Sequence, residues 1–199
     1  RMTRVGDLDK VLRGIDAARC AGFERIKINS VVLKNYNHDE IPDLVRFAMQ
    51  HAMDITFIEE LPVGIIGDHD RAEAFYSSDA ILADLQSNFT LQASGESTGG
   101  PSRYYRIPGS RTRVGFISPH SHNFCSQCNR VRLTAEGRLL LCLGQEHSVD
   151  LRRIVRTHPL DDEPLRQAII DSMQIKPEGH EFDLEAKPVI FRHMNATGG

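Results

Sequence analysis

Three cysteines lie close together in the sequence: Cys125, Cys128 and Cys142, with the spacing C-x2-C-x13-C. The chain's other cysteine, Cys20, is more than a hundred residues away. Three thiolates can hold a metal ion or an iron–sulfur cluster and leave one coordination position open, as catalytic and substrate-binding sites require, whereas structural metal sites are usually closed. We therefore predict a metal or cluster site at these three cysteines.

Two arginines follow the second cysteine. Arg130 and Arg132 alternate with apolar residues over 130–134, a pattern that predicts a strand with both guanidinium groups on one face. Guanidinium pairs bind the oxygens of phosphate and carboxylate groups. The stretch indicates a site for an anionic substrate beside the metal, phosphate above all, although paired arginines on a strand also occur as a solvated face.

The thirteen-residue spacer can close, because Ala135-Glu136-Gly137 predicts a turn between two strand-like runs. A hairpin centred near residue 136 brings Cys142 next to Cys128. The spacing by itself does not decide which metal or cluster the cysteines bind. A structural zinc would need a fourth ligand, for which the nearby candidates are His120, His122 and His147.

The composition limits the classes of function. The chain has 199 residues, of which 40% are hydrophobic, enough for a substantial core. Its net charge of −3 and pI near 6.3 argue against a general nucleic-acid or membrane-surface binder. No apolar run has the length of a membrane span, and no export leader is recognised. Four cysteines, three of them clustered, fit a reducing cytoplasm better than a disulfide framework.

Hydrophobic periodicity predicts α/β architecture. The first part of the chain alternates helices and strands, at 7–21, 25–33, 39–52 and 55–61, which implies parallel strands joined by crossovers in an α/β barrel or doubly wound fold. The pattern changes near residue 67, so we predict two domains, 1–67 and 68–199. The second should contain one or two helices at 70–87, strands at 104–107, 112–117, 130–134 and 138–143, and helices at 148–157 and 162–175.

Two pairs of polar residues mark the first two strands. Lys27 and Asn29 share one face of the strand at 25–33. Such a face is usually exposed, unless the strand belongs to a barrel whose interior binds a ligand. Glu59 and Glu60 end the next strand and could act as acid–base groups, although charges at a strand end are usually just solvated. Because the chain opens directly on a helix pattern without an initiator methionine, we also expect it to be part of a longer protein.

Several motifs together resemble those of the GTP 3′,8-cyclase family, radical S-adenosylmethionine enzymes that start molybdenum cofactor biosynthesis. The resemblance rests on the cysteine block and the segments around it: Gly115-Phe-Ile-Ser-Pro119, Phe124-Cys-Ser-Gln-Cys-Asn-Arg-Val-Arg-Leu-Thr134 and Gly137-Arg-Leu-Leu-Leu-Cys-Leu143. Weaker matches occur in the same order along the chain: Ile26-Lys-Ile-Asn-Ser-Val-Val32, Phe57-Ile-Glu59, Lys176-Pro-Glu-Gly-His180 and Gly198-Gly199.

The resemblance implies a fold and two cofactors. The fold would be part of an incomplete TIM-like barrel, followed by a C-terminal α+β segment whose antiparallel strands carry a [4Fe–4S] cluster. The family's other [4Fe–4S] cluster cleaves S-adenosylmethionine and is held by a C-x3-C-x2-C motif. That motif is absent from this sequence, so this chain alone is expected to be an inactive, C-terminal part of the enzyme.

The resemblance also implies roles for individual residues. The C-terminal cluster matches Cys125, Cys128 and Cys142, and its open iron would contact the guanine of GTP. Arg130 and Arg132 match the arginines that bind the triphosphate. Lys27 matches a lysine of the same pocket, while Gly198 and Gly199 match a tail that reaches the active site. In one departure, Thr56 stands where many relatives have arginine.

The function that follows is a radical S-adenosylmethionine lyase reaction, the conversion of GTP to (8S)-3′,8-cyclo-7,8-dihydroguanosine 5′-triphosphate, with this chain as the GTP-binding part. Two alternatives remain: the auxiliary-cluster part of another radical S-adenosylmethionine enzyme, and a non-enzymatic zinc-stabilised binding module. The expected partner is GTP, without nucleic acid or membrane. An unpaired strand edge invites self-association, so a homo-oligomer is an alternative to a monomer.

Overall fold

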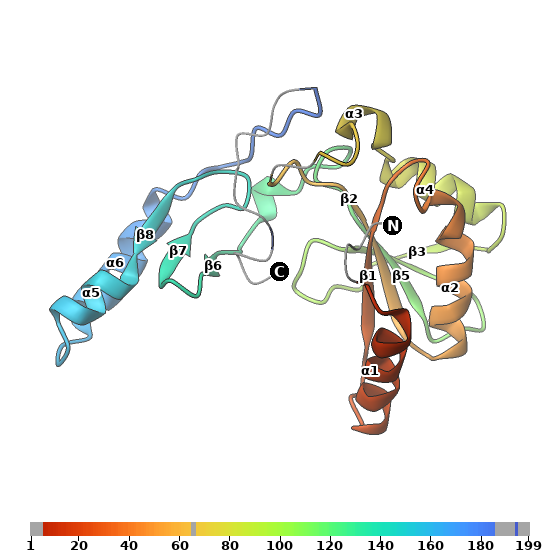
Figure 1. Cartoon of the computed structure of the whole chain (residues 1–199), viewed down its shortest axis with the longest axis horizontal. Coiled ribbons are helices and arrows are strands. Elements are labelled where there is room, and N and C mark those ends of the chain that lie inside the picture. Colours follow the sequence, from red (N-terminus) through yellow and green to blue (C-terminus); the bar gives the residue numbers. More distant parts are fainter. Residues whose placement is uncertain (1–5, 65–66, 186–193, 195–199) are drawn as a thin grey trace. The chain divides into compact units, whose positions relative to one another are not determined.

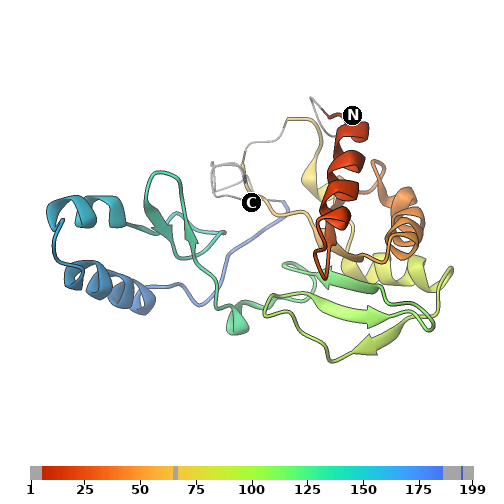
Figure 2. The same ribbon diagram turned by 90° about the horizontal axis from the view of Figure 1, so that it is seen from below.

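The computed structural model describes residues 6–64, 67–185 and 194, and the chain forms two compact units (Figures 1 and 2). The first, here called the sheet unit, comprises residues 1–60 and 74–122. The second, the cysteine unit, comprises residues 61–73 and 123–199. Both contain helices and strands, so the predicted mixed α/β class is confirmed. The predicted division at residue 67 stays a prediction.

The sheet unit contains five strands: β1 Lys27–Val32, β2 Asp54–Glu59, β3 Gln92–Ser94, β4 Arg103–Arg106 and β5 Arg113–Ile117. Its helices are α1 Leu8–Cys20, the short 3₁₀ helix η1 His38–Glu40, α2 Ile41–Gln50 and α4 Ser78–Gln86. The four-residue helix α3 Arg71–Ala74 precedes α4, and all but its last residue belong to the cysteine unit. The prediction missed the three-residue strand β3, whose exposed residues carry no hydrophobic period.

The five strands form one mixed sheet in the order β1-β2-β5-β4-β3. Strand β2 runs parallel to both β1 and β5, whereas β4 is antiparallel to β5 and to β3. The predicted parallel pairing of the first two strands is therefore confirmed. Among the described residues the sheet remains open and does not close into a barrel.

The two faces of this sheet differ in chemistry. One face is apolar and packs against α2 and α4, with Ile55 and Phe57 of β2 wholly buried (Figure 1). The strand register places polar residues opposite one another on the other face, here called the polar face: Lys27 pairs with Asp54, Asn29 with Thr56, Thr56 with Gly115, and Tyr104 with Gly115. Side chains two residues apart share a face, so the polar residues of four strands gather there.

The helices begin where capping chemistry allows. The Asp7 carboxylate accepts a hydrogen bond from the backbone N–H of Lys10 at the start of α1 (3.0 Å), and the Ser77 hydroxyl accepts one from Ala80 at the start of α4 (3.2 Å). Helix α1 has no buried residue, and Leu8 remains 71% exposed. Its amphipathic pattern is therefore not explained by packing within the described residues.

The cysteine unit contains a three-stranded antiparallel sheet, in the order β6-β7-β8, and two helices that lie side by side in Figure 2. The strands are β6 Arg132–Leu133, β7 Arg138–Leu140 and β8 Ser148–Asp150, and the helices are α5 Leu151–Thr157 and α6 Glu163–Gln174. A short 3₁₀ helix, η2 Cys125–Gln127, precedes the sheet. The small core of the cysteine unit consists of Leu139, Leu141 and Leu151.

The hairpin predicted near residue 136 is confirmed: β6 and β7 pair with Arg132 opposite Leu140. Gly137 has a φ of 78°, a left-handed conformation that glycine adopts without strain. Two ranges differ from the prediction. The strand predicted at 130–134 is paired only at 132–133, and residues 148–150, predicted as helix, form β8 against β7. Asp150 then caps α5 through the backbone N–H of Arg153 (2.9 Å).

We predict that Asp54→Asn destabilises the protein strongly. Asp54 is 4% exposed and forms an ion pair with the buried Arg113. The substitution leaves the buried Arg113 with only the partly exposed Glu96 as its counter-ion, and breaking a buried pair costs up to about 3–5 kcal/mol. Urea unfolding followed by circular dichroism measures the change. The matched control is Asp16→Asn, which removes an exposed pair with Arg19 on α1 and should have a far smaller effect; equal effects would contradict the prediction.

Candidate functional site

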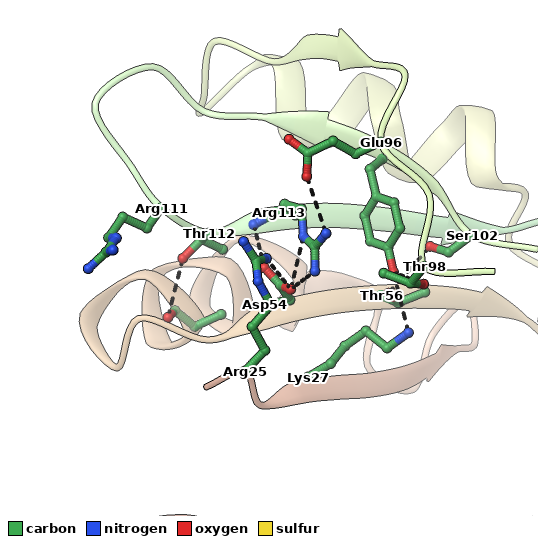
Figure 3. Close-up of polar contacts among 12 residues, drawn as sticks. Arg25, Lys27, Asp54, Thr56, Glu96, Thr98, Ser102, Arg111, Thr112 and Arg113 are labelled. Carbon is green, nitrogen blue, oxygen red and sulfur yellow. Dashed lines mark hydrogen bonds and ion pairs between the residues drawn. The ribbon is translucent and has the colours of Figure 1, made fainter. Parts of the chain in front are cut away.

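The polar face contains a buried ion network at the start of β2 (Figure 3). The Asp54 carboxylate accepts hydrogen bonds from the backbone N–H and Nε of Arg113 (2.9 and 3.0 Å) and from Nη1 of Arg25 (3.1 Å). Burial raises the pKa of Asp54, but these hydrogen bonds and positive charges outweigh it, and the net shift is downward. Glu96 accepts from Arg113 (3.2 Å) and from Arg106. Each of these arginines is therefore matched by a carboxylate.

Lys27 differs from these arginines. Its ammonium group donates a hydrogen bond to the hydroxyl of Tyr104 (3.4 Å), a neutral partner (Figure 3). The side chain belongs to an exposed position of β1. The charge of Lys27 therefore has a neutral hydrogen-bond partner, and its ligand-binding role stays a prediction.

Thr56 occupies the centre of the polar face and is wholly buried. Its hydroxyl lies 3.5 Å from that of Ser102, and both approach the backbone of Gly115. A Cβ at Gly115 would lie 2.3 Å from Ser102 Oγ and 2.6 Å from Thr56 Oγ1. Only glycine therefore allows these two hydroxyls to occupy this part of the face.

Glu59, at the carboxyl end of β2, is a structural residue. It is 0% exposed, and its carboxylate accepts hydrogen bonds from the backbone N–H of Ser78 (2.9 Å), His120 (2.9 Å) and Ser121 (3.1 Å), and from the Ser121 hydroxyl. Burial raises the pKa of Glu59, but these donors outweigh it and the pKa is lowered. The interpretation of Glu59 as a solvated strand-end charge is wrong, because the chain folds around the carboxylate.

In the cysteine unit, the C-x2-C pair lies on one short turn. Cys125 begins η2, its backbone N–H donates to Asn123 Oδ1 (2.7 Å), and the N–H of Cys128 donates to the carbonyl of Cys125 (3.0 Å). Cys142 follows β7. It lies two residues beyond the last residue of that strand, Leu140. All three cysteines are half-buried, and none forms a disulfide within the described residues.

Arg130 is directed to the cysteines. Its Nη2 donates to Cys128 Sγ (3.5 Å), and its guanidinium lies 4.9 Å from the centre of the Phe124 ring. Burial raises the pKa of Cys128, but the hydrogen bonds and charge of Arg130, with the charge of Lys176, outweigh it and the pKa is lowered. Arg132 lies in β6, whereas Arg130 precedes that strand, and the shared face of the two arginines stays a prediction.

The segment Lys176-Pro-Glu-Gly-His180 was only a weak motif in the sequence. It lies against the cysteine turn and against the residues that follow β7. The Lys176 ammonium donates to the carbonyl of Leu141 (2.9 Å), directly before Cys142. The Gly179 carbonyl accepts from Gln145 Nε2 (3.0 Å), and a Cβ at Gly179 would lie 3.7 Å from Cys125 Sγ. The sequence signal that could have identified this contact is a lysine and a glycine, Lys176 and Gly179, close together in a region without helical or strand periodicity.

The thiols do not converge as around a single ion. Within 6–64, 67–185 and 194, no three side chains of Cys, His, Asp or Glu lie together in a way that could hold one metal ion. The three candidate histidines have other contacts: His120 with the Glu60 carbonyl, His122 with Asp79 and His147 with Gln145. A cubane cluster binds each cysteine through a separate iron, so its thiolates stand farther apart than those around one ion. The donor set of three accessible thiols fits a cluster in its chemistry.

Gly198 and Gly199 lie outside the described residues. No helix within the described parts of the chain combines the length and apolar character that crossing a bilayer requires.

Comparisons with known proteins place the chain in a family. The profile of the family Molybdenum Cofactor Synthesis C matches residues 53–182. Over its whole length the chain is 59% identical to the GTP 3′,8-cyclase of Saccharophagus degradans, 60% to that of Pseudomonas putida strain W619 and 56% to that of Marinobacter nauticus. The chain spans 60% of the length of each of these relatives. The chain belongs to the Molybdenum Cofactor Synthesis C family, and the predicted resemblance to GTP 3′,8-cyclases is confirmed.

We predict that Glu59→Gln destabilises the fold and changes its acid sensitivity. The amide would place an NH₂ group against backbone donors, at a cost of about 1–3 kcal/mol. Because folding lowers the Glu59 pKa, the ionised carboxylate stabilises the protein above its ordinary pKa of 4.5, and this contribution is lost as the pH falls through the lower folded value.

Urea unfolding at pH values from about 3 to about 7 measures this effect, because such a carboxylate titrates within this range. The variant should lose less stability than wild type as the pH falls below about 4.5. Asp16→Asn, which removes an exposed pair with Arg19, is the control and should follow the wild-type profile. Identical profiles for wild type and Glu59→Gln would contradict the assignment.

Proposed function

We propose that this chain is the GTP-binding part of a GTP 3′,8-cyclase, a lyase that converts GTP to (8S)-3′,8-cyclo-7,8-dihydroguanosine 5′-triphosphate by radical S-adenosylmethionine chemistry. The observation that carries the proposal is the Cys-x2-Cys-Asn-Arg-Val-Arg block. It lies within the segment matched by the family profile, in a chain about 60% identical to curated cyclases. The reaction would occur in the cytoplasm, where free thiols persist.

The parallel strands fit part of an incomplete TIM-like barrel. In the sheet unit, β1, β2 and β5 run parallel, and the helices α2 and α4 cover only one face. A closed TIM barrel fills its interior with side chains, whereas an incomplete barrel that encloses a ligand would carry ligand-binding groups on its inner face. The polar face, with Lys27, Asn29 and Thr56, would be that inner face.

Cys125, Cys128 and Cys142 would hold a [4Fe–4S] cluster and leave one iron without a protein ligand. When bound, this cluster would supply a Lewis-acidic iron to the guanine of GTP. Arg130 would support it through its hydrogen bond to Cys128 Sγ. A second [4Fe–4S] cluster and S-adenosylmethionine would be held by the remaining part of a protein as long as the relatives.

The basic residues would bind and orient the substrate. Arg130 and Arg132 would contact the triphosphate, for which the planar guanidinium offers paired donors. Lys27 would also contact GTP, since its charge is not matched by a carboxylate on the polar face. Gly198 and Gly199 would reach the reacting groups. The radical chemistry belongs to the cofactors, whereas these residues determine the position of GTP.

We expect anaerobic reconstitution to load this chain with about four irons and four acid-labile sulfides, the content of one cubane cluster. Cys125→Ser should reduce this content, because it removes one of three ligands. Cys20→Ser is the matched control, since Cys20 is exposed on α1, and should leave the content unchanged. Iron and sulfide analysis with visible absorption measures the result. Stoichiometric zinc without sulfide would instead support a zinc-stabilised binding module.

We expect Arg130→Ala and Arg132→Ala each to weaken GTP binding by about 1.5–3 kcal/mol, the contribution of a hydrogen bond between charged groups. The measurement is equilibrium binding of GTP to the full-length protein with its clusters loaded. Lysine should restore little, because it cannot offer paired donors. The control Arg156→Ala alters an exposed arginine of α5 and should bind GTP as wild type does. Unchanged affinity in both variants would return these arginines to a solvated-face role.

A further inference from the structure

Tyr104 connects Lys27 to the rest of the polar face. The tyrosine lies on β4 opposite Gly115 and is 1% exposed. Its hydroxyl accepts the hydrogen bond of the Lys27 ammonium (3.4 Å) and lies 3.1 Å from Thr98 Oγ1. The phenol is thus the contact through which the exposed lysine is tied to the fold.

The ring of Tyr104 is held from two sides. The Arg113 guanidinium lies 4.8 Å from the ring centre, a cation–π distance. A Cβ at Gly115 would lie 2.9 Å from Tyr104 Cε1, so the ring packs on a strand with no side chain at this point. Because Arg113 is itself fixed by Asp54, the position of the Tyr104 hydroxyl follows from the buried ion network.

The hydroxyl network orients Lys27 without neutralising it. The Tyr104 oxygen accepts a hydrogen bond from the Lys27 ammonium and can donate its own hydrogen to Thr98 Oγ1. Because the tyrosine is buried, its hydroxyl stays among these partners. Burial raises the pKa of Tyr104, but hydrogen bonds with Thr98, Ser102 and Lys27 outweigh it and the pKa is lowered. An ammonium group has three donors, of which the tyrosine occupies one. The charge and the other donors remain for an anionic ligand.

We propose that Tyr104 is a positioning residue, which holds the Lys27 ammonium in place for the phosphate groups of the bound nucleoside triphosphate. The inference rests on the proposed function, since it needs GTP as the ligand of the polar face. A lysine side chain has four flexible methylene groups and loses conformational freedom when it binds phosphate. Holding the ammonium group beforehand reduces that loss, so the tyrosine hydroxyl strengthens binding without touching the ligand.

A double-mutant cycle in the full-length, cluster-loaded protein tests this inference. The variants are Tyr104→Phe, Lys27→Ala and the double variant, and the measurement is equilibrium binding of GTP and of guanosine. Tyr104→Phe should weaken GTP binding about three- to tenfold, the worth of one hydrogen bond, and leave guanosine binding unchanged. In the Lys27→Ala background the same substitution should have no further effect, because the two residues act as one unit.

The matched control is Tyr105→Phe, one residue along β4. Tyr105 packs edge-on against Phe116 (5.4 Å between ring centres) in the apolar core, so the loss of its hydroxyl should leave GTP affinity unchanged. Thermal unfolding of each variant reports whether the fold is intact.

The outcomes separate the inference from the proposed function. Wild-type GTP affinity in Tyr104→Phe, with weakened binding in Lys27→Ala, overturns the positioning role and leaves the proposed function standing. Equal weakening by Tyr104→Phe with and without Lys27, or equal weakening for guanosine, shows a purely structural tyrosine and also overturns it. Unchanged GTP affinity in Lys27→Ala removes Lys27 from the proposed site and the inference with it, whereas failure of the wild-type protein to bind GTP contradicts the proposed function itself.

Discussion

The contact between Asp54 and Arg113 organises the sheet unit, because a carboxylate buried at the start of a central strand must be neutralised. Its oxygens receive both the backbone and the guanidinium of Arg113, which fixes β5 against β2. Arg113 then packs on the ring of Tyr104, and Tyr104 contacts Lys27. One electrostatic requirement at the start of β2 thus determines the place of side chains on β1, β4 and β5.

The same residue types have different roles in the two units, and the difference lies in their neighbours. Arg25, Arg106 and Arg113 face carboxylates, so their charge is used to stabilise the fold. Arg130 instead contacts a thiol and an aromatic ring, and no ion pair with an acid is formed within the part of the chain that the structure describes. Lys27 contacts a phenol. A basic residue whose partner is neutral can still attract an anion, and this distinction is the basis on which we propose that Arg130 and Lys27 bind a phosphate-bearing substrate.

Local chemistry explains how the cysteine unit presents its thiols. The turn over 125–128 sets the first two cysteines one 3₁₀ turn apart, and the glycine at position 137 allows the hairpin that returns the third. The segment 176–180 lies against the turn and against the residues before Cys142. Lys176 donates to the carbonyl of Leu141, and Gly179 lies beside Cys125. A small core of leucines supports this arrangement. The thiols therefore depend on contacts between segments up to about fifty residues apart.

Most elements could be predicted from the sequence, because amphipathic period, turn residues and the cysteine spacing are local properties. They were sufficient for the helices, for the parallel pair β1 and β2, for the hairpin and for the family. Tertiary structure alone decided that β5 joins the parallel pair, that Glu59 is buried among backbone donors instead of solvated, and that Ser148–Asp150 pairs as a strand. It also decided which cations are matched by carboxylates. Each depends on partners distant in the chain, and the energy of a charge is set by its surroundings, which local sequence does not encode.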